Sequence, residues 1–175
     1  MEYFILTQDR RINVPKLPAE LIKAVPKLIV STSKVRNLTD AMAFPIQNNQ
    51  DGEYPAVINQ EVYLVNTQVK DVLGQYDWKL ASSPTMFNDM HKGQQHLYWV
   101  LDIKTVDCLA DETIFNPNRT LRKLVLNERK VIHIPMFKIG GILEEYVAVR
   151  LDVAESLLRR DIYGIELKPI LTNNT

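Results

Sequence analysis

The chain has 175 residues, and its 21 lysine and arginine residues balance its 21 aspartate and glutamate residues, so its formal net charge is zero. This balance excludes a global field that would hold the phosphate backbone of nucleic acid or an anionic membrane. A hydrophobic content of 46% is ordinary for a globular domain. A domain of this size buries roughly 70% of the surface that its unfolded chain exposes.

Cysteine usage and the first residues indicate the compartment. The single cysteine, Cys108, leaves no internal disulfide, as is usual in a reducing cytoplasm. The opening MEYFILTQDRR sets Glu2 before a short apolar run, a pattern unlike a signal peptide or a spanning helix. We therefore expect a cytoplasmic protein.

The first half of the chain predicts few regular elements. Tyr3 to Leu6 alternate as a strand covered on both faces. Three prolines between Arg10 and Pro26 leave at most a short helix around residues 19–24, with a short strand at 28–30. Residues 31–40 are turn-like, and turn formers in residues 42–55 predict a surface loop.

The middle of the chain predicts one helix and one long strand. Broken strand material at 56–64 precedes a helix that Asn66 or Thr67 caps and Gly74 ends. Trp78 and Leu80 indicate a strand, and residues 84–95 a loop. The longest strand pattern follows at 96–109, before a turn-rich connection at 110–120. Residues 121–134 favour two strands joined at Asn127 and Glu128, although their spacing also permits a helix.

Residues 131–168 predict a strand, a glycine turn, a strand, a capped helix and a closing strand. Gly140 and Gly141 permit a tight reversal. Asp152 is the expected helix cap, with Glu155 reaching back to it, and Gly164 the expected stop. We therefore predict a single α+β domain over residues 1–170, with a mainly antiparallel sheet, a few helices packed on one face and a frayed tail at 171–175.

No catalytic, metal or cofactor motif is found. The three histidines and Cys108 lack the short paired spacings of zinc sites. Cys108 lies in an apolar strand, where a small core residue is favoured over a nucleophile. Gly140 and Gly141 lack the spacing of a phosphate loop, and no serine lies in a nucleophile elbow. We predict no catalytic residue, no metal and no cofactor.

Charged residues cluster in the second half of the chain. Glu144 and Glu145 are adjacent, so on a strand they would point to opposite faces rather than act as a paired acid and base. Asp111 and Glu112 belong to an acidic series at the end of the long strand, which favours a solvated face over a binding site. The basic counterparts lack an aromatic platform for single-stranded nucleic acid. They are Arg119, Arg122, Lys123, Arg129 and Lys130.

Several segments resemble a known bacterial family. They are the long strand with its acidic end (YWVLDIKTVDCLADETI), the hairpin, the last helix with its strand (LDVAESLLRRDIYGIELKPI), the opening MEYFILTQD and VYLVNTQVKDVL. In pattern and order, over about half of the chain, they are similar to the polymorphic-toxin immunity family called immunity protein eleven. Residues 10–56 and 84–95 show no match, and tryptophan is scarcer than in the family.

The resemblance implies a cytoplasmic antitoxin that binds and neutralises a toxin domain encoded by a neighbouring gene and is not an enzyme. It transfers no contact residues. If the toxin is a basic nuclease, the acidic residues Asp111, Glu112, Glu144 and Glu145 are the expected contacts. Nucleic acid and membranes are not expected partners.

Two alternatives remain open. One is an enzyme or small-molecule-binding domain with a site assembled from scattered residues such as Tyr98, Asp102, His133 and Glu145. The other is an interaction or scaffold module without a toxin partner. A deep pocket holding perturbed carboxylates or histidine favours the enzyme or ligand-binding domain.

Overall fold

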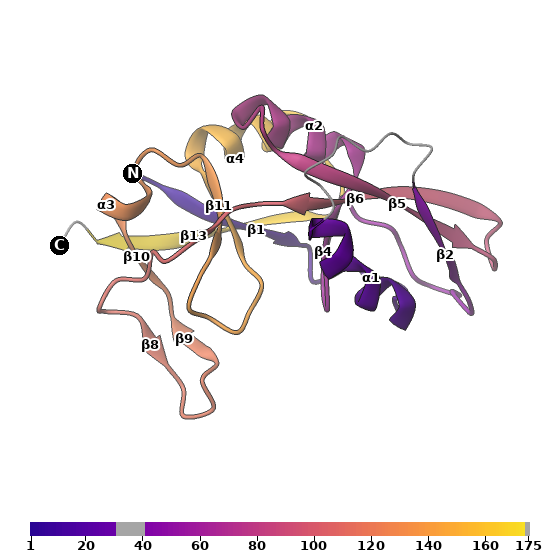
Figure 1. The fold of residues 1–175 in the computed structure, drawn as a ribbon, viewed down its shortest axis with the longest axis horizontal. Helices are drawn as coiled ribbons and strands as arrows, with labels where there is room; N and C mark the ends of the chain where they lie inside the picture. The colour runs from indigo at the N-terminus through magenta and orange to yellow at the C-terminus, as the bar shows by residue number, and fades with distance from the viewer. Residues whose placement is uncertain (31–40, 174–175) are drawn as a thin grey trace. The chain divides into compact units, whose positions relative to one another are not determined.

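The computed structural model describes residues 1–30 and 41–173, and Figure 1 shows their fold. The chain is an α+β protein with 20% helix, 39% strand and mostly antiparallel pairing, which confirms the predicted class. The residues form two compact units, each with a hydrophobic core of its own. Unit 1 comprises Met1–Thr7, Ile103–Asp161 and Glu166–Thr175, and unit 2 comprises Gln8–Asp102 and Ile162–Ile165. The expectation of one domain over residues 1–170 stays a prediction.

Unit 2 is built on a five-stranded sheet with the order β2, β5, β6, β4, β3. Its elements are α1 (Ala19–Val30), β2 (Met42–Ile46), β3 (Val57–Asn59), β4 (Tyr63–Val65), α2 (Thr67–Tyr76), β5 (Ala81–Asp89) and β6 (Gln94–Asp102). β2 runs parallel to β5, and the other pairs are antiparallel.

Helices lie against both faces of this sheet. Tyr98 and Val100 share a buried cluster with α1. Trp99, which points the opposite way along β6, donates its indole N–H to Thr67 of α2. The sheet of unit 2 therefore carries a helix against each face, whereas helices were expected on one face.

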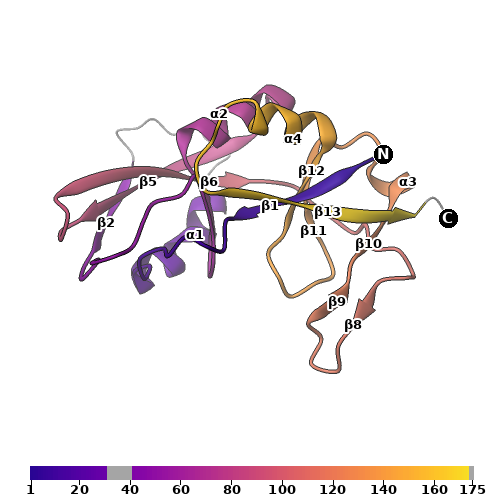
Figure 2. The ribbon, with the colours of Figure 1, turned by 180° about the vertical axis from the view of Figure 1, so that it is seen from behind.

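Unit 1 is built on a six-stranded sheet with the order β10, β13, β1, β12, β11, β7. Its elements are β1 (Tyr3–Gln8), β7 (Thr105–Val106), β10 (Val125–Asn127), α3 (Glu128–Val131), β11 (Met136–Ile139), β12 (Val147–Arg150), α4 (Leu151–Leu158) and β13 (Ile165–Asn173). β8 (Ile114–Phe115) and β9 (Leu121–Lys123) form a separate two-stranded hairpin, seen in Figure 2 below the sheet.

Three predicted elements are confirmed. β1 pairs with β12 from Tyr3 to Leu6. Helix α2 begins after Asn66, whose side chain accepts the N–H of Val69, and it buries the predicted apolar face; it continues past Gly74 to Tyr76. β11 and β12 form the predicted antiparallel hairpin.

The proline-rich part of unit 2 differs from the prediction. Residues 19–30 form one helix that includes Pro26, because Leu21, Val25 and Leu28 recur at helical spacing and are buried in the core. The strand predicted at 28–30 is therefore wrong. The turn-like segment predicted at 31–40 lies outside the described residues.

Parts of two predicted loops are strands: β2 takes up the start of the loop predicted at 42–55, and β5 and β6 extend into the loop predicted at 84–95. β2 contains Pro45, which a strand at the edge of a sheet tolerates because one side makes no ladder hydrogen bonds. β5 contains Pro84, and its pairing with β2 begins one residue later, at Thr85. The strand predicted at Trp78 to Leu80 is a turn, and the strand starts at Ala81.

The long strand predicted at 96–109 is divided between the two units. β6 ends at Asp102, and β7 pairs in parallel with β11 in unit 1. Of the two strands predicted within 121–134, the first is divided into β9 and β10. The second is wrong, because Asn127 caps the short helix α3 where that strand was expected. β11 accordingly starts only at Met136.

The end of the chain also brings corrections. The reversal between β11 and β12 is a loop over residues 140–146, wider than the tight turn predicted. Asp152 is not the N-cap, because α4 begins one residue earlier, at Leu151, with Arg150 in the cap position. The carboxylate of Asp152 still accepts the backbone N–H of Val153 in the first turn, as expected of a group at a helix start, and it also accepts two hydrogen bonds from Arg150. Gly164 takes the left-handed conformation (φ +77°) before β13 but lies beyond the end of α4. Residues 171–173 are paired with β10 rather than frayed, and 174–175 lie outside the described residues.

Candidate functional site

The four acidic residues predicted to contact a toxin lie in two segments of unit 1. Asp111 and Glu112 are exposed in the turn before β8, and the carboxylate of Glu112 accepts a hydrogen bond from the side chain of Asn173. Glu144 and Glu145 lie in the 140–146 loop rather than on a strand. Whether the four carboxylates contact a partner protein stays a prediction.

Glu144 and Glu145 have different roles in the fold. Oε1 of Glu144 accepts the backbone N–H of Leu121 in β9 at 3.0 Å, and its Oε2 is buried without a hydrogen-bond partner in the described part of the chain. Glu145 forms an ion pair with Lys138 on β11, at 2.5 Å. The two carboxylates therefore engage separate groups and form no acid and base pair.

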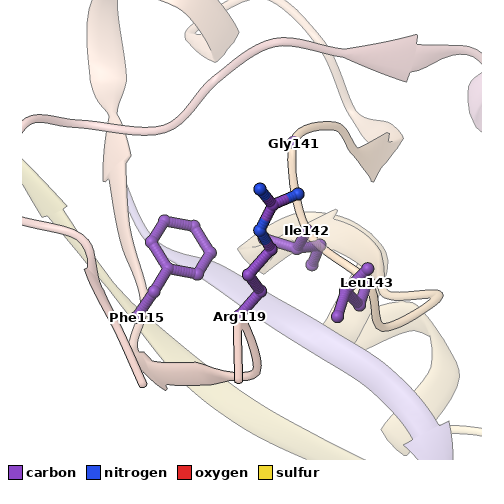
Figure 3. Close-up of a pocket in the computed structure, with 5 residues that line it drawn as sticks. All are labelled: Phe115, Arg119, Gly141, Ile142 and Leu143. Carbon is purple, nitrogen blue, oxygen red and sulfur yellow. The ribbon is translucent and has the colours of Figure 1, made fainter. Parts of the chain in front are cut away.

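A pocket lies between the β8–β9 hairpin and the 140–146 loop. It has a volume of about 440 Å³ and is lined by Phe115, Arg119, Gly141, Ile142 and Leu143. Figure 3 shows the side chain of Arg119 extending between the ring of Phe115 and the loop that carries Ile142 and Leu143. The pocket thus combines apolar walls with one guanidinium group.

The turn of the hairpin sets the position of Arg119. The backbone N–H of Asn116 donates to the carbonyl of Thr120, and that of Arg119 donates to the carbonyl of Asn116. Arg119 adopts a left-handed conformation (φ +64°), which costs a residue with a side chain about 1–2 kcal/mol. These turn hydrogen bonds hold a conformation that an isolated peptide would avoid.

Large apolar side chains are exposed around this pocket. Ile114 and Phe115 are 44% and 40% exposed, and Leu143 is 70% exposed. Charged residues flank them, because Arg122 and Lys123 are exposed on β9. Among the described residues, no ion pair or hydrogen bond involves the side chains of Arg119, Arg122 or Lys123. We refer to Ile114, Phe115, Arg119, Ile142 and Leu143 as the hairpin–loop surface.

Unit 2 holds a buried polar cluster around Asp89, which is 2% exposed. One carboxylate oxygen accepts the side-chain N–H of Asn49 and the hydroxyl of Tyr54, and the other accepts the backbone N–H groups of His91 and Lys92. Burial opposes the charge of Asp89, but these hydrogen bonds outweigh it and lower its pKa to about 2. Asp89 is therefore an ionised group that holds the loops of unit 2 together.

His96 and Tyr54 complete this cluster. Their rings stack at 3.6 Å between centroids, and Nε2 of His96 is buried without a partner among the described residues. Burial lowers the pKa of His96. Burial, followed by the hydrogen bond to Asp89, raises the pKa of Tyr54. Both groups are neutral near pH 7, which makes this a packed polar core.

A second pocket lies in unit 2 beside this cluster. It has a volume of about 700 Å³ and is lined mainly by residues 13–16 and 47–52 with Gln60, including several asparagine and glutamine amides. Gly52 is required at its wall, because a Cβ atom there would lie 2.3 Å from Oδ1 of Asn49. Amide groups can donate and accept hydrogen bonds, and Lys16 and Asp51 also line the pocket, so it suits a small polar ligand.

The other candidate residues from the sequence are each either buried in a core or exposed to solvent. The hydroxyl of Tyr98 donates to the carbonyl of Pro55, whereas His133 and Asp102 are exposed. Cys108 is fully buried in the unit 1 core, as predicted for a small core residue, and burial raises the pKa of its thiol to about 11. Within residues 1–30 and 41–173, no three metal-ligating side chains are grouped. No helix in those ranges is long and apolar enough to span a membrane.

No protein-family model matches the chain, and no curated protein matches it.

The residues of the hairpin–loop surface do not stand out in the sequence. The pattern of residues 110–120 predicts a turn-rich connection, yet Ile114 and Phe115 form a strand there. The available signal was the pair of large apolar residues between polar turn formers (DETIFNPN), which is unusual for a connection that nothing covers.

Proposed function

We propose that the chain is an immunity protein that binds a bacterial toxin domain in the cytoplasm and neutralises it. The proposal starts from the resemblance in strand, hairpin and helix pattern described above. A blocking protein of this kind needs no catalytic group of its own. It needs a preformed surface of roughly 800 Å² with a few strong anchors.

The observation that best supports the proposal is the hairpin–loop surface. Aromatic and arginine side chains are enriched among the residues that dominate protein interfaces. Phe115 and Arg119 line one pocket, and the exposed side chain of Leu143 lies across it. An apolar group of this kind, rimmed by charged residues, is typical of a protein-binding surface.

The arrangement of backbone groups supports a rigid surface. The hairpin is tied to the 140–146 loop by the hydrogen bond from Leu121 to Glu144. The loop is anchored at its other side by the ion pair of Glu145 with Lys138. Since the backbone of both segments is held before binding, little backbone freedom would be lost, and such a surface favours tight association.

Growth rescue tests the proposal. The toxin domain encoded next to this chain is expressed from an inducible promoter, with and without the chain. The proposal expects growth to be restored and the two proteins to co-purify. Continued growth arrest with a folded, well-expressed chain, together with no co-purification, contradicts it.

A second candidate function is the binding of a small polar ligand in unit 2. The pocket lined by Asn49, Gly52 and neighbouring amides favours it, and a buried carboxylate and histidine lie beside this pocket. A screen of sugars, nucleosides and amino acids by thermal shift distinguishes the two functions. A stabilising ligand whose effect is lost in Asn49→Ala supports the second candidate, and growth rescue supports the first.

A further inference from the structure

We propose that the hairpin–loop surface is where the toxin is held, and that it takes an apolar side chain of the toxin with a carboxylate beside it. The apolar side chain enters the pocket between Phe115 and Leu143, and Arg119 binds the carboxylate. This inference rests on the proposed function and adds the chemistry of the segment that the toxin presents.

The expectation that the toxin presents an apolar side chain follows from the walls of the pocket. Its volume of about 440 Å³ lies near the lower end of the range for ligand pockets, ~300–1,000 Å³. Its walls are not enclosed, because Phe115 and Leu143 remain 40% and 70% exposed. Sites for small molecules bury most of the ligand, whereas an open apolar pocket suits one side chain of a larger surface that covers the rest.

The expectation that the toxin presents a carboxylate follows from the charges around the pocket. Figure 3 shows Arg119 reaching into the pocket between Phe115 and the loop. Its guanidinium has no ion-pair or hydrogen-bond partner among the described residues, and Arg122 and Lys123 are exposed nearby on β9. Guanidinium groups bind carboxylates through two parallel hydrogen bonds.

The acidic residues nearby do not neutralise this charge. Glu145 is paired with Lys138. Glu144 forms no ion pair among the described residues: one of its oxygens accepts the backbone N–H of Leu121, and the other is buried in the fold. The pocket therefore presents apolar walls beside a guanidinium that has no ion-pair partner in the described part of the chain, and its complement is an acidic and apolar segment. A nucleic acid would meet apolar walls where its phosphates need donors, so a protein segment fits better.

The test uses the full chain and the purified toxin domain. Arg119→Glu reverses the charge, Arg119→Lys keeps the charge but removes the two-pronged donor, and Leu143→Asp places a carboxylate at the apolar rim. Trp78→Ala and Lys79→Glu are matched controls, because Trp78 is 85% exposed in unit 2 with Lys79 over its ring, outside this surface. Circular dichroism and thermal unfolding verify that each variant folds.

The expected affinity loss is about 30-fold or more for Arg119→Glu and Leu143→Asp, since anchor residues cost at least about 2 kcal/mol. Arg119→Lys should lose less, and the controls should stay within twofold of the wild type. Exchanging surface carboxylates of the toxin for lysine, one at a time, should find one exchange that restores binding to Arg119→Glu and weakens binding to the wild type.

Three other outcomes would overturn the inference, and one of them would overturn the proposed function as well. Wild-type affinity in both Arg119→Glu and Leu143→Asp overturns this inference and leaves the proposed function standing. Failure of the wild-type chain itself to bind the toxin overturns the proposed function and the inference together. If Leu143→Asp abolishes self-association of the chain but not toxin binding, the surface joins two copies, and the inference is overturned.

Discussion

The backbone N–H of Leu121 donates to Oε1 of Glu144 at 3.0 Å, and this hydrogen bond ties the β8–β9 hairpin to the loop between β11 and β12. The two segments are more than twenty residues apart in sequence, and together they form the walls of the pocket that contains Arg119. Glu144 therefore shapes the candidate interface from within, in addition to any contact with a partner.

Replacing Glu144 with alanine should loosen the hairpin. A buried hydrogen bond to a charged group contributes about 1.5–3 kcal/mol, so local opening at Leu121 should become about tenfold more frequent or more. Amide hydrogen exchange at Leu121 measures it. Glu145→Ala is the matched control because Glu145 pairs with Lys138 instead. Equal exchange rates in wild type and Glu144→Ala would contradict the tie.

If the toxin domain is basic overall, exposed acidic residues should accelerate its encounter with the chain. Changing Asp111 and Glu112 to lysine should slow association several-fold at low salt, and the difference should shrink as salt screens the charges. Stopped-flow association rates at two salt concentrations measure this. Reversal of Glu144 and Glu145 together should also slow association. Glu144→Ala, which loosens the hairpin without reversing a charge, separates the effect of the structural change from the effect of the charge. An unchanged rate at low salt for both pairs would remove the steering role.

Asp89→Asn should destabilise the fold by about 2–3 kcal/mol, because four donors lose a charged acceptor and the new amide N–H groups face them. Denaturant unfolding at pH 7 measures it. Asp51→Asn, which changes an exposed carboxylate in the nearby loop, is the control and should have little effect. A loss below about 0.5 kcal/mol would mean that the cluster does not hold the loops.

Asp89 should also make the stability of the fold depend on pH in the acid range. The pKa of Asp89 in the fold is about 2, below its ordinary value of 3.8. Its charge therefore stabilises the fold fully above pH 3.8, and this contribution is lost as the pH falls through about 2. Asp89→Asn should flatten the stability profile between these two values. A wild-type slope in the variant would assign the acid sensitivity to other groups.

Cys108 should be inert in the native protein. Its thiol is fully buried, and burial raises its pKa to about 11, so almost no thiolate is present at pH 8. Labelling with an aromatic disulfide at pH 8 should proceed only as fast as the fold opens, and it should accelerate in denaturant. Fast labelling of the folded chain would instead indicate an accessible, activated cysteine.

The sequence pattern predicted the helices and strands whose formation depends mainly on residues close to them in the chain. Alternation marked β1 and β6, the Asn66 cap marked α2, and two glycines marked the β11–β12 reversal. The missed elements depend on distant partners. β2 and β5 contain prolines that normally break strands, and α1 contains Pro26, but burial against the rest of unit 2 outweighs their local cost.

The candidate site was less accessible from the sequence. Arg119 reaches the pocket because a left-handed turn conformation directs it there, and an arginine, unlike a glycine or an asparagine, gives no sign of that conformation in the sequence. Leu143 lies across the pocket from Phe115 because its loop is tied to β9, by the hydrogen bond of Glu144 to a residue more than twenty positions away. The acidic residues were visible as a series, but their different partners follow from the tertiary fold.

The most direct test of the central claim is a titration of the purified toxin domain with the purified chain, following both heat of binding and toxin activity. The account predicts one-to-one binding in the nanomolar range or tighter, with activity falling to zero at equivalence. No heat of binding and full toxin activity at a tenfold excess of folded chain would contradict it.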